Sequence, residues 1–227
     1  HLIIMYENII AIPFRNRDEH LEYFIKNTVP LLQEHLPNTK VIVVEQNEGK
    51  LFNRGALLNV AFKEYKNKTK FFFTHDVDMT PSLKIIKTIY TKEDIEMFRV
   101  KSAHSSSLGG IIKVHHDIIF DINGFPNNIW GWGIEDRALY YRCCIKNINI
   151  TNNINQSFKL MPHSCNKEQY TGEKKLISDM WRQNYIDKLD DKQKEEMIMG
   201  SGVNNLEYTI LERKNIHDMV ELIKVEI

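Results

Sequence analysis

The chain has 227 residues, of which 42% are hydrophobic and 26% are charged, as in an ordinary globular domain with a full core. Its 30 acidic and 30 basic residues give a formal net charge of zero, so no basic footprint predicts binding to nucleic acid or to an anionic membrane. We therefore expect a single domain over residues 1–227 whose function depends on a local site. The sequence does not set the number of subunits.

Strand and helix patterns alternate through the first 80 residues. The strands are expected at 8–12, 40–45 and 70–75, and the helices at 17–35 and 53–66. Pro13 should close the first strand, and Pro30 should end or kink the first helix. Alternation at this spacing is typical of α/β proteins with a parallel, Rossmann-like sheet, in which ligands bind beyond the carboxyl ends of the strands.

The remainder of the chain is less regular. Residues 81–107 resemble a loop with short helical pieces. The elements expected after it are a strand over 108–114, helices over 115–121 and 135–146, a strand over 158–162, helix-prone residues over 173–199, and strands near 206–212 and 218–226. No internal repeat or domain boundary interrupts this order.

Two carboxylates follow the third predicted strand. Asp76 and Asp78 flank Val77 directly after an apolar run, and strand alternation would send both to the same side. Carboxylate oxygens in this arrangement suit a divalent cation that bridges a diphosphate. A solvated turn is the alternative interpretation, because Asp-x-Asp also occurs by chance.

Cationic and aromatic side chains follow the first strand and open the second helix. Arg15 and Arg17 come directly after the first strand, and Arg54 lies at the start of the helix. Guanidinium groups suit phosphate oxygens, and helix N-termini attract anions. Phe14 and Phe52 lie beside these arginines, where a phenyl ring could stack on a nucleobase. The alternative is a surface cluster near a helix start.

The segment 123–136 combines two tryptophans with three glycines and ends on the pair Glu135-Asp136. Two of the glycines flank Trp132, so a flexible backbone carries a large flat side chain that could cover a sugar ring. We interpret the segment as a hinged lid that carries a general base, in which one carboxylate takes a proton from a sugar hydroxyl and the other fixes an orientation. The alternative is an exposed turn whose two acids begin a helix, and the two interpretations are compatible.

His163 follows the strand predicted at 158–162 and is a candidate nitrogen ligand for the same metal as Asp78. A lone histidine is more often structural, so the residues alone favour a structural role. The other histidines and Cys165 lack the spacing of a metal site.

Taken together, these residues resemble the beta-1,4-galactosyltransferase family of inverting, manganese-dependent glycosyltransferases. The matching segments run in order along the chain and comprise 12–21, 52–60, 76–78, 109–110, 123–136, 163–164 and 201–208. The resemblance implies a GT-A fold, that is, a Rossmann-like mixed sheet flanked by helices, in one glycosyltransferase domain. Its nucleotide-binding half would span about 8–80, and its lid, acceptor and metal half about 108–227.

The resemblance also implies the roles of individual residues. A UDP-sugar donor would be bound by Pro13, Phe14, Arg15, Arg17, Phe52, Arg54, Asp76 and Gly110. Asp78 and His163 would hold Mn²⁺, with Mg²⁺ as the alternative. Asp136 would be the catalytic base beside Glu135, and Trp132 would cover the donor and help form the acceptor site. The reaction would be a single displacement of UDP by a hydroxyl of a glycan or glycosylated acceptor.

Three positions depart from the family pattern. Leu160 replaces a methionine that often binds the metal, and it cannot coordinate, so Met161, Cys165 or a water are candidates for the third ligand. Ser107 replaces the tyrosine that is usual in galactose-transferring members, which makes an N-acetylhexosamine donor as plausible as galactose. Arg137, directly after the expected base, replaces an acid that many members carry.

The alternative function is a catalytically weak or inactive module on the same fold that binds a UDP-sugar or another carbohydrate. The missing methionine ligand favours it, whereas the retained base, lid tryptophan and metal residues oppose it. A third class, nucleotidyl transfer or diphosphate hydrolysis, could use Asp76 and Asp78 with a metal but leaves the tryptophan-rich lid unexplained.

The expected location follows from the cysteines and the hydropathy. Of the three cysteines, Cys143 and Cys144 are adjacent and do not suit a mutual disulfide, and no apolar run reaches the ~18 residues of a membrane helix. The secretory anchor and disulfides of the family are not recognisable. We expect a cytoplasmic, reducing location for the chain as it stands, with a Golgi-type lumen if an anchor was removed before His1.

Overall fold

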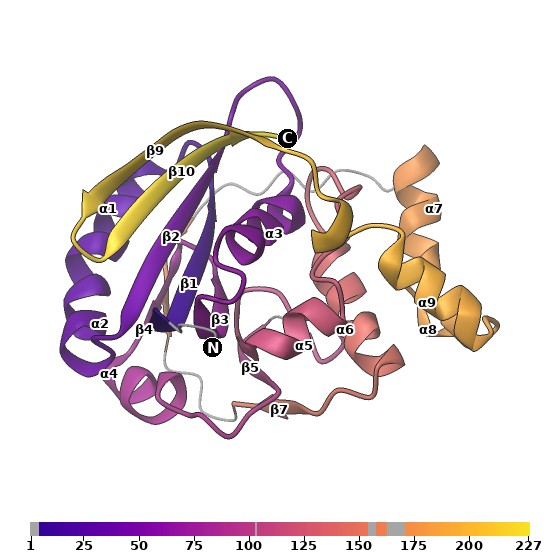
Figure 1. The fold of residues 1–227 in the computed structure, drawn as a ribbon, viewed down its shortest axis with the longest axis horizontal. Helices are drawn as coiled ribbons and strands as arrows, with labels where there is room; N and C mark the ends of the chain where they lie inside the picture. The colour runs from indigo at the N-terminus through magenta and orange to yellow at the C-terminus, as the bar shows by residue number, and fades with distance from the viewer. Residues whose placement is uncertain (1–4, 103, 154–157, 163–170) are drawn as a thin grey trace.

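A mixed eight-stranded sheet forms the centre of the protein, with helices on both faces (Figure 1). The computed structural model describes residues 5–102, 104–153, 158–162 and 171–227. Across the sheet the strands follow the order β7 (Ile150–Asn152), β5 (Met97–Lys101), β6 (Ile111–His115), β3 (Thr69–His75), β1 (Tyr6–Phe14), β2 (Thr39–Gln46), β10 (Val220–Glu226) and β9 (Thr209–His217). Two short strands, β4 (Met79–Pro81) and β8 (Phe158–Leu160), pair antiparallel as a separate ribbon.

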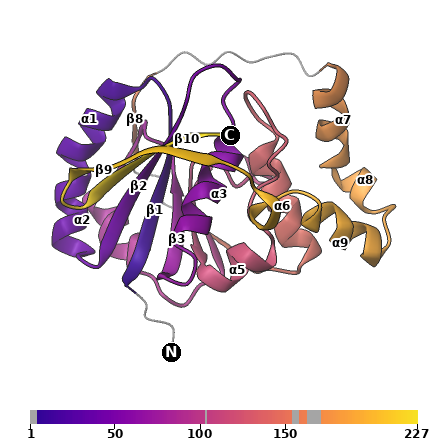
Figure 2. The same ribbon diagram turned by 45° about the horizontal axis from the view of Figure 1, so that its top comes forward.

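The helices form two layers and a terminal group. One layer contains α1 (Asp18–Asn27), α2 (Val29–His35), α4 (Leu83–Ile85) and the π-helix η1 (Ile86–Tyr90). The opposite layer contains α3 (Arg54–Glu64), α5 (His116–Asp121) and α6 (Glu135–Ile145). The group α7 (Gly172–Met180), α8 (Gln183–Ile186) and α9 (Asp191–Met199) stands at the end of the molecule farthest from α1 and α2 (Figures 1 and 2), followed by the 3₁₀ turn η2 (Val203–Asn205).

Strand β1 is buried on both faces and runs parallel to its neighbours β2 and β3. Ile9 and Ala11 pack in the core on the α3 side, whereas Ile10 and Ile12 pack in the core on the α1 and α2 side. A strand covered on both faces needs apolar side chains at every position, which explains the unbroken apolar run in its sequence. The predicted parallel arrangement of the first three strands is confirmed.

Proline has different effects at its two predicted positions. Pro13 does not close the first strand, because β1 continues through Phe14 and Pro13 remains in register with Val44 of β2. Proline is tolerated near the end of a strand, where one ladder hydrogen bond can be lost. The helix predicted over 17–35 does break, at Thr28, and Pro30 lies in the first turn of α2, where its missing N–H costs nothing.

The sequence was misleading at three further places. The segment 81–107 contains strand β5 rather than only a loop with helical pieces, and the strand near 206–212 begins at Thr209 and continues to His217. Strand β9 is exposed from Thr209 to Asn215. No apolar periodicity therefore marks where this strand ends. The Asp76–Asp78 segment is a turn rather than a continuing strand, since the Met79 N–H donates to the Asp76 carbonyl at 3.2 Å.

A cluster of asparagine side chains fixes the loop that precedes α6. Asn59 of α3 is fully buried and donates to the Phe125 carbonyl at 2.6 Å, while its Oδ1 accepts from the Phe125 N–H at 2.9 Å. Asn123 donates to Asn204 at 2.9 Å and accepts from the Asn204 N–H at 3.0 Å. Gly124 has φ +59°, and a Cβ there would lie 2.3 Å from Asn59 Oδ1, so only glycine fits.

Candidate active site

The carboxyl ends of β1, β2 and β3 meet at one edge of the sheet, and the side chains that follow them pair across this edge. Arg17 Nη1 lies 3.7 Å from Asp78 Oδ2. Arg54 Nη2 lies 2.8 Å from Asp76 Oδ1. The structure therefore brings together cations and carboxylates that lie in separate segments of the sequence.

Asn53 determines where Arg54 lies. The Asn53 side chain caps α3 by accepting from the Ala56 N–H at 3.0 Å, and its own N–H donates to Gln46 Oε1 at the end of β2 at 2.8 Å. The Asn53 amide also donates to the Asn127 carbonyl at 2.7 Å. The first residue of α3 is thereby fixed to the sheet edge on one side and to the approach of the 123–136 segment on the other.

Arg54 connects Asp76 at this edge of the sheet to the acidic pair Glu135-Asp136. Its guanidinium bonds Asp76 through Nε at 2.9 Å and Nη2 at 2.8 Å, and its Nη1 lies 3.8 Å from Glu135 Oε1. Burial raises the pKa of Glu135 to about 7, the neighbouring Asp136 adds to this rise, and Arg54 opposes it. Glu135 thus exchanges its proton near neutral pH, inside a chain of alternating charges.

Asp136 is held at both carboxylate oxygens in the first turn of α6. Oδ1 accepts from the Arg137 N–H at 2.8 Å, and Oδ2 accepts from the Ser107 hydroxyl at 2.5 Å. The Asp136 carbonyl accepts from the Leu108 N–H at 3.0 Å. A Cβ at Gly109 would lie 3.0 Å from Oδ2, so a glycine there leaves room for the carboxylate.

The backbone of the 123–136 segment turns through left-handed conformations just before the acidic pair. Gly131 has φ +75°, Gly133 has φ +85°, and Ile134 has φ +84°. Ile134 is a β-branched residue with positive φ, which is strained, and its side chain is buried against the core of the α6 to α8 helices. The Gly131 N–H donates to the Phe52 carbonyl at 2.8 Å, so the segment rests on the loop before α3.

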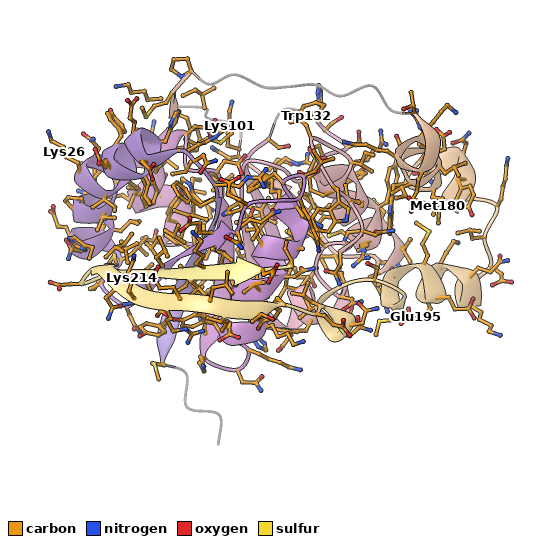
Figure 3. The ribbon with its side chains drawn as sticks, turned by 90° about the horizontal axis from the view of Figure 1, so that it is seen from above. Lys26, Lys101, Trp132, Met180, Glu195 and Lys214 are labelled. Atoms are coloured by element: carbon orange, nitrogen blue, oxygen red, sulfur yellow. The ribbon has the colours of Figure 1, made fainter. Side chains whose placement is uncertain are left out.

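The two tryptophans of this segment have different surroundings. The Trp130 ring lies under Lys50 Nζ at 5.5 Å from its centroid. Trp132 is 48% exposed and lies on the same edge of the molecule as Lys101 (Figure 3). An indole exposed to this extent, four residues before Asp136 in the sequence, provides a flat apolar face for a sugar ring.

The expected nucleotide-binding residues fall into two groups. Arg15 and Phe52 form a partly exposed pair, in which the guanidinium carbon lies 5.4 Å from the ring centroid and Arg15 Nη1 donates to the Lys50 carbonyl at 2.7 Å. Pro13 is buried, and Phe14 is only 4% exposed and packs in the core on the α1 side. Phe52 is therefore the ring that this edge offers to a base.

Gly110 belongs to the same edge through its backbone. Its carbonyl accepts from the Asp76 N–H at 3.2 Å and from Arg54 Nη2 at 3.5 Å. Its φ is +67°, and a Cβ would lie 2.5 Å from the Lys101 carbonyl oxygen, so a larger residue would push β5 away.

Of the two expected metal ligands, Asp78 lies among the residues that the structure describes, and its carboxylate suits a divalent metal. It is 8% exposed, and its carbonyl accepts from the Met161 N–H at 2.9 Å, which brings the residue two before His163 against it. His163 and Cys165 lie outside the described residues, and among the described residues no three His, Cys, Asp or Glu side chains form a metal cluster. A carboxylate joined by a histidine nitrogen would fit Mn²⁺ or Mg²⁺. Leu160 is 55% exposed and provides no donor atom.

Two family models match the chain in succession. The model for the N-terminal region of glycosyl transferase group 7 matches residues 3–90, and the model for the N-terminal domain of galactosyltransferase matches residues 91–164. The chain belongs to this family of glycosyltransferases. Among its relatives, it is 29% identical to beta-1,4-galactosyltransferase 1 of Bos taurus over 89% of the chain, and 32% identical to beta-1,4-galactosyltransferase 6 of Homo sapiens over 80%. It spans about half the length of these curated relatives.

Solved structures of the family share the fold. The catalytic domain of Drosophila beta-1,4-galactosyltransferase 7, in complex with xylobiose, superposes with a TM-score of 0.80 at 20% identity, and the match covers 98% of this chain and 94% of that one. A mutant of the same enzyme in complex with manganese, UDP-Gal and xylobiose gives 0.79 over the same coverage. The chain has the GT-A fold. None of the helices in the described ranges is long and apolar enough to cross a membrane.

Sequence reasoning missed two contacts of this site. The sequence assigns Ser107 to the donor side, but its hydroxyl bonds Asp136. Arg137 donates through Nη2 to the hydroxyl of Ser178 at 2.6 Å and to its carbonyl at 2.9 Å, which connects α6 to α7. Neither contact has a sequence signal, because the partners are 29 and 41 residues apart in segments without periodicity. Trp181 is 4% exposed and belongs to the core between α6 and α8.

Proposed function

We propose that this chain is an inverting glycosyltransferase that moves a sugar from a UDP-sugar to a hydroxyl of a glycan or glycosylated acceptor, with Asp136 as the base. The observation that carries the proposal is the continuous chain from Asp76 through Arg54 to the Glu135-Asp136 pair. It joins a cationic edge of the sheet to the two carboxylates that follow the exposed Trp132 in the sequence. The relatives that match most of the chain support the same reaction class.

The nucleotide would bind at the ends of β1 and β2. Arg15, Arg17 and Arg54 supply positive charge for a diphosphate, and Phe52 supplies a ring for the base. Asp78 and His163 would hold the divalent metal, which when bound neutralises negative charge on the diphosphate. Leu160 gives the metal no ligand, and this supports a water, Met161 or Cys165 in that place.

Asp136 would remove the proton of the acceptor hydroxyl while that oxygen attacks the anomeric carbon from the side opposite to UDP. A bond forms between the acceptor oxygen and the anomeric carbon as the bond to the diphosphate breaks, so the anomeric configuration inverts. Trp132 would close over the donor through the left-handed turns at Gly131 and Gly133 and exclude water from the site. Glu135 would orient Arg54 and the donor sugar.

The donor class that we propose is a galactose or an N-acetylhexosamine. The mutant Drosophila beta-1,4-galactosyltransferase 7 was crystallised with UDP-Gal, which supports galactose. The small Ser107 side chain supports the larger N-acetylhexosamine.

Cys143 and Cys144 are free thiols, which supports the cytoplasmic, reducing location.

The test is release of UDP from a panel of UDP-sugars in the presence of manganese, with and without glycan acceptors. We expect turnover of one sugar that is abolished by EDTA and by Asp78→Ala. Asp136→Asn should lower transfer about 100-fold or more while the Kd for UDP stays within about threefold. Asp94→Asn, an exposed aspartate far from these residues in the sequence, is the matched control.

Sugar binding without turnover by any UDP-sugar would favour the alternative binding module, and diphosphate cleavage that survives Asp136→Asn would favour the third class.

A further inference from the structure

Two serine hydroxyls form a hydrogen-bonded chain that ends on the Asp136 carboxylate. Ser102 Oγ lies 3.2 Å from Ser107 Oγ, and Ser107 Oγ lies 2.5 Å from Asp136 Oδ2. Ser107 is 4% exposed, whereas Ser102 is half-buried. This series of hydrogen bonds therefore runs from a partly solvent-exposed serine to the proposed base.

The chemistry of the three groups fixes the direction of donation. An ionised carboxylate can only accept, so the single proton of Ser107 must point to Asp136. Ser107 Oγ can then only accept from its other neighbours, which are the Gly109 N–H at 3.4 Å and the Ser102 hydroxyl at 3.2 Å. Ser102 Oγ also lies 3.0 Å from the Ser107 carbonyl. A hydroxyl that donates to a charged acceptor forms one of the stronger hydrogen bonds in proteins, and a buried one has no water to replace it.

The other contacts of Asp136 leave its orientation dependent on Ser107. Oδ1 accepts from the adjacent Arg137 N–H, and this hydrogen bond holds only one of the two carboxylate oxygens. Gly109 provides space rather than a contact that stops rotation, because it has no side chain. The Ser107 hydroxyl holds the other oxygen, Oδ2, so the two hydrogen bonds together set the rotation of the carboxylate about its Cβ–Cγ bond.

We propose that Ser107 is a positioning residue for Asp136, and that Ser102 orients the Ser107 hydroxyl. This inference rests on the proposed function, since it assigns Ser107 to the base rather than to recognition of the donor sugar. A base that is rotated away from the acceptor hydroxyl loses rate while substrate binding is retained. The opposite pattern follows if Ser107 recognises the donor.

The kinetic test compares Ser107→Ala, Ser107→Thr and Ser102→Ala with the exposed Ser105→Ala as control. We expect Ser107→Ala to lower kcat about 10- to 100-fold, with the donor and acceptor KM within about twofold of the parent chain. Ser107→Thr keeps the hydroxyl and should restore most of kcat. Ser102→Ala should lower kcat only a few-fold, because it acts through Ser107. A raised donor KM with unchanged kcat, or no change in either constant, overturns the proposal.

A structural measurement separates this proposal from the proposed function. Crystal structures of the parent chain and of Ser107→Ala, grown under the same conditions, report the Asp136 rotamer without any turnover. We expect one ordered carboxylate orientation in the parent chain and a rotated or multiple orientation in the variant. An unchanged Asp136 carboxylate in Ser107→Ala overturns the positioning role, whether or not the chain transfers a sugar.

Discussion

Glu135 is the residue whose ionisation the fold perturbs most clearly near neutral pH. It is 7% exposed and lies between Arg54 and Asp136, and burial raises its pKa from 4.5 to about 7. In the unfolded chain the same carboxyl titrates near its ordinary value. The folded state therefore binds a proton that the unfolded state has released between about pH 4.5 and 7, and stability must fall as the pH rises through this range.

Glu135→Gln tests this linkage, because glutamine resembles the protonated acid at every pH. Near pH 4.5 the variant and the parent chain should have similar free energies of unfolding. As the pH rises to 8 the variant should become more stable than the parent chain by on the order of 2 kcal/mol, since only the parent chain must bury a charge. Urea unfolding at pH 5, 6, 7 and 8 measures the difference, with the exposed Glu195→Gln as control. A difference that is constant across these pH values would contradict the linkage.

At this scale the sequence predicted the identity of site residues better than their partners. Arg54, Asp76 and Glu135 are each recognisable from their positions at strand or helix ends, but the sequence assigns them to separate roles. Their pairing depends on how α3 crosses the sheet edge, and residues 54 and 135 have no spacing that reveals it. The Ser107 contact is invisible for the same reason.

At the scale of elements, hydrogen bonds from helix side chains hold the loops in place. Asn59 satisfies both the N–H and the carbonyl of Phe125, and so fixes the loop that leads into the 123–136 segment and α6. The sequence shows Asn59 only as a polar residue on an otherwise apolar helix. A buried amide on such a helix is the one signal that a backbone segment docks against it.

Replacing Asn59 by alanine leaves two buried backbone groups without these partners. We expect a loss of about 2–4 kcal/mol in the free energy of unfolding, measured by urea denaturation with the exposed Asn38→Ala as control. The variant should also lose transfer activity more steeply than stability, because the displaced loop leads into the first turn of α6, which carries Asp136. A change within about 0.5 kcal/mol would show that water or another group satisfies Phe125.

Predictability differs between the two ends of the sheet. The apolar strands β1, β2 and β3 are recognisable because both faces are buried, and their parallel order follows from the helices between them. The edge strands β7 and β9, and β5 beside β7, are short or exposed, and neither long apolar runs nor clear periodicity mark their bounds. The turn at Asp76–Asp78 was only the alternative interpretation of the sequence, since it depends on backbone hydrogen bonds rather than on residue types.

At the scale of the whole molecule, one sheet carries both halves of the site, so a ligand that binds across them should stabilise the entire fold. Any ligand that binds only the folded state adds RT ln(1 + [L]/Kd), or about 2.7 kcal/mol at one hundred times its Kd. UDP with manganese should therefore raise the midpoint of thermal unfolding by roughly 5–10 °C for a chain of this size.

Differential scanning fluorimetry measures this shift and its dependence on the metal. EDTA should remove most of the stabilisation by UDP, and Asp78→Ala should abolish the part that manganese adds. Asp94→Asn should respond as the parent chain does. Stabilisation by UDP that is the same with and without manganese would contradict the proposed metal site, although it would still support a nucleotide site.

The position of β10 has a consequence for how the chain folds. It inserts beside β2 as a parallel strand, with Val220 opposite Val41, although about 180 residues separate the two. This pairing closes a loop that contains nearly every other element, so it is entropically the most expensive contact in the sheet and should form last. Until it does, β2 has an open edge although both of its faces are apolar, and the nascent protein depends on the pairing of β10 before that edge meets another chain.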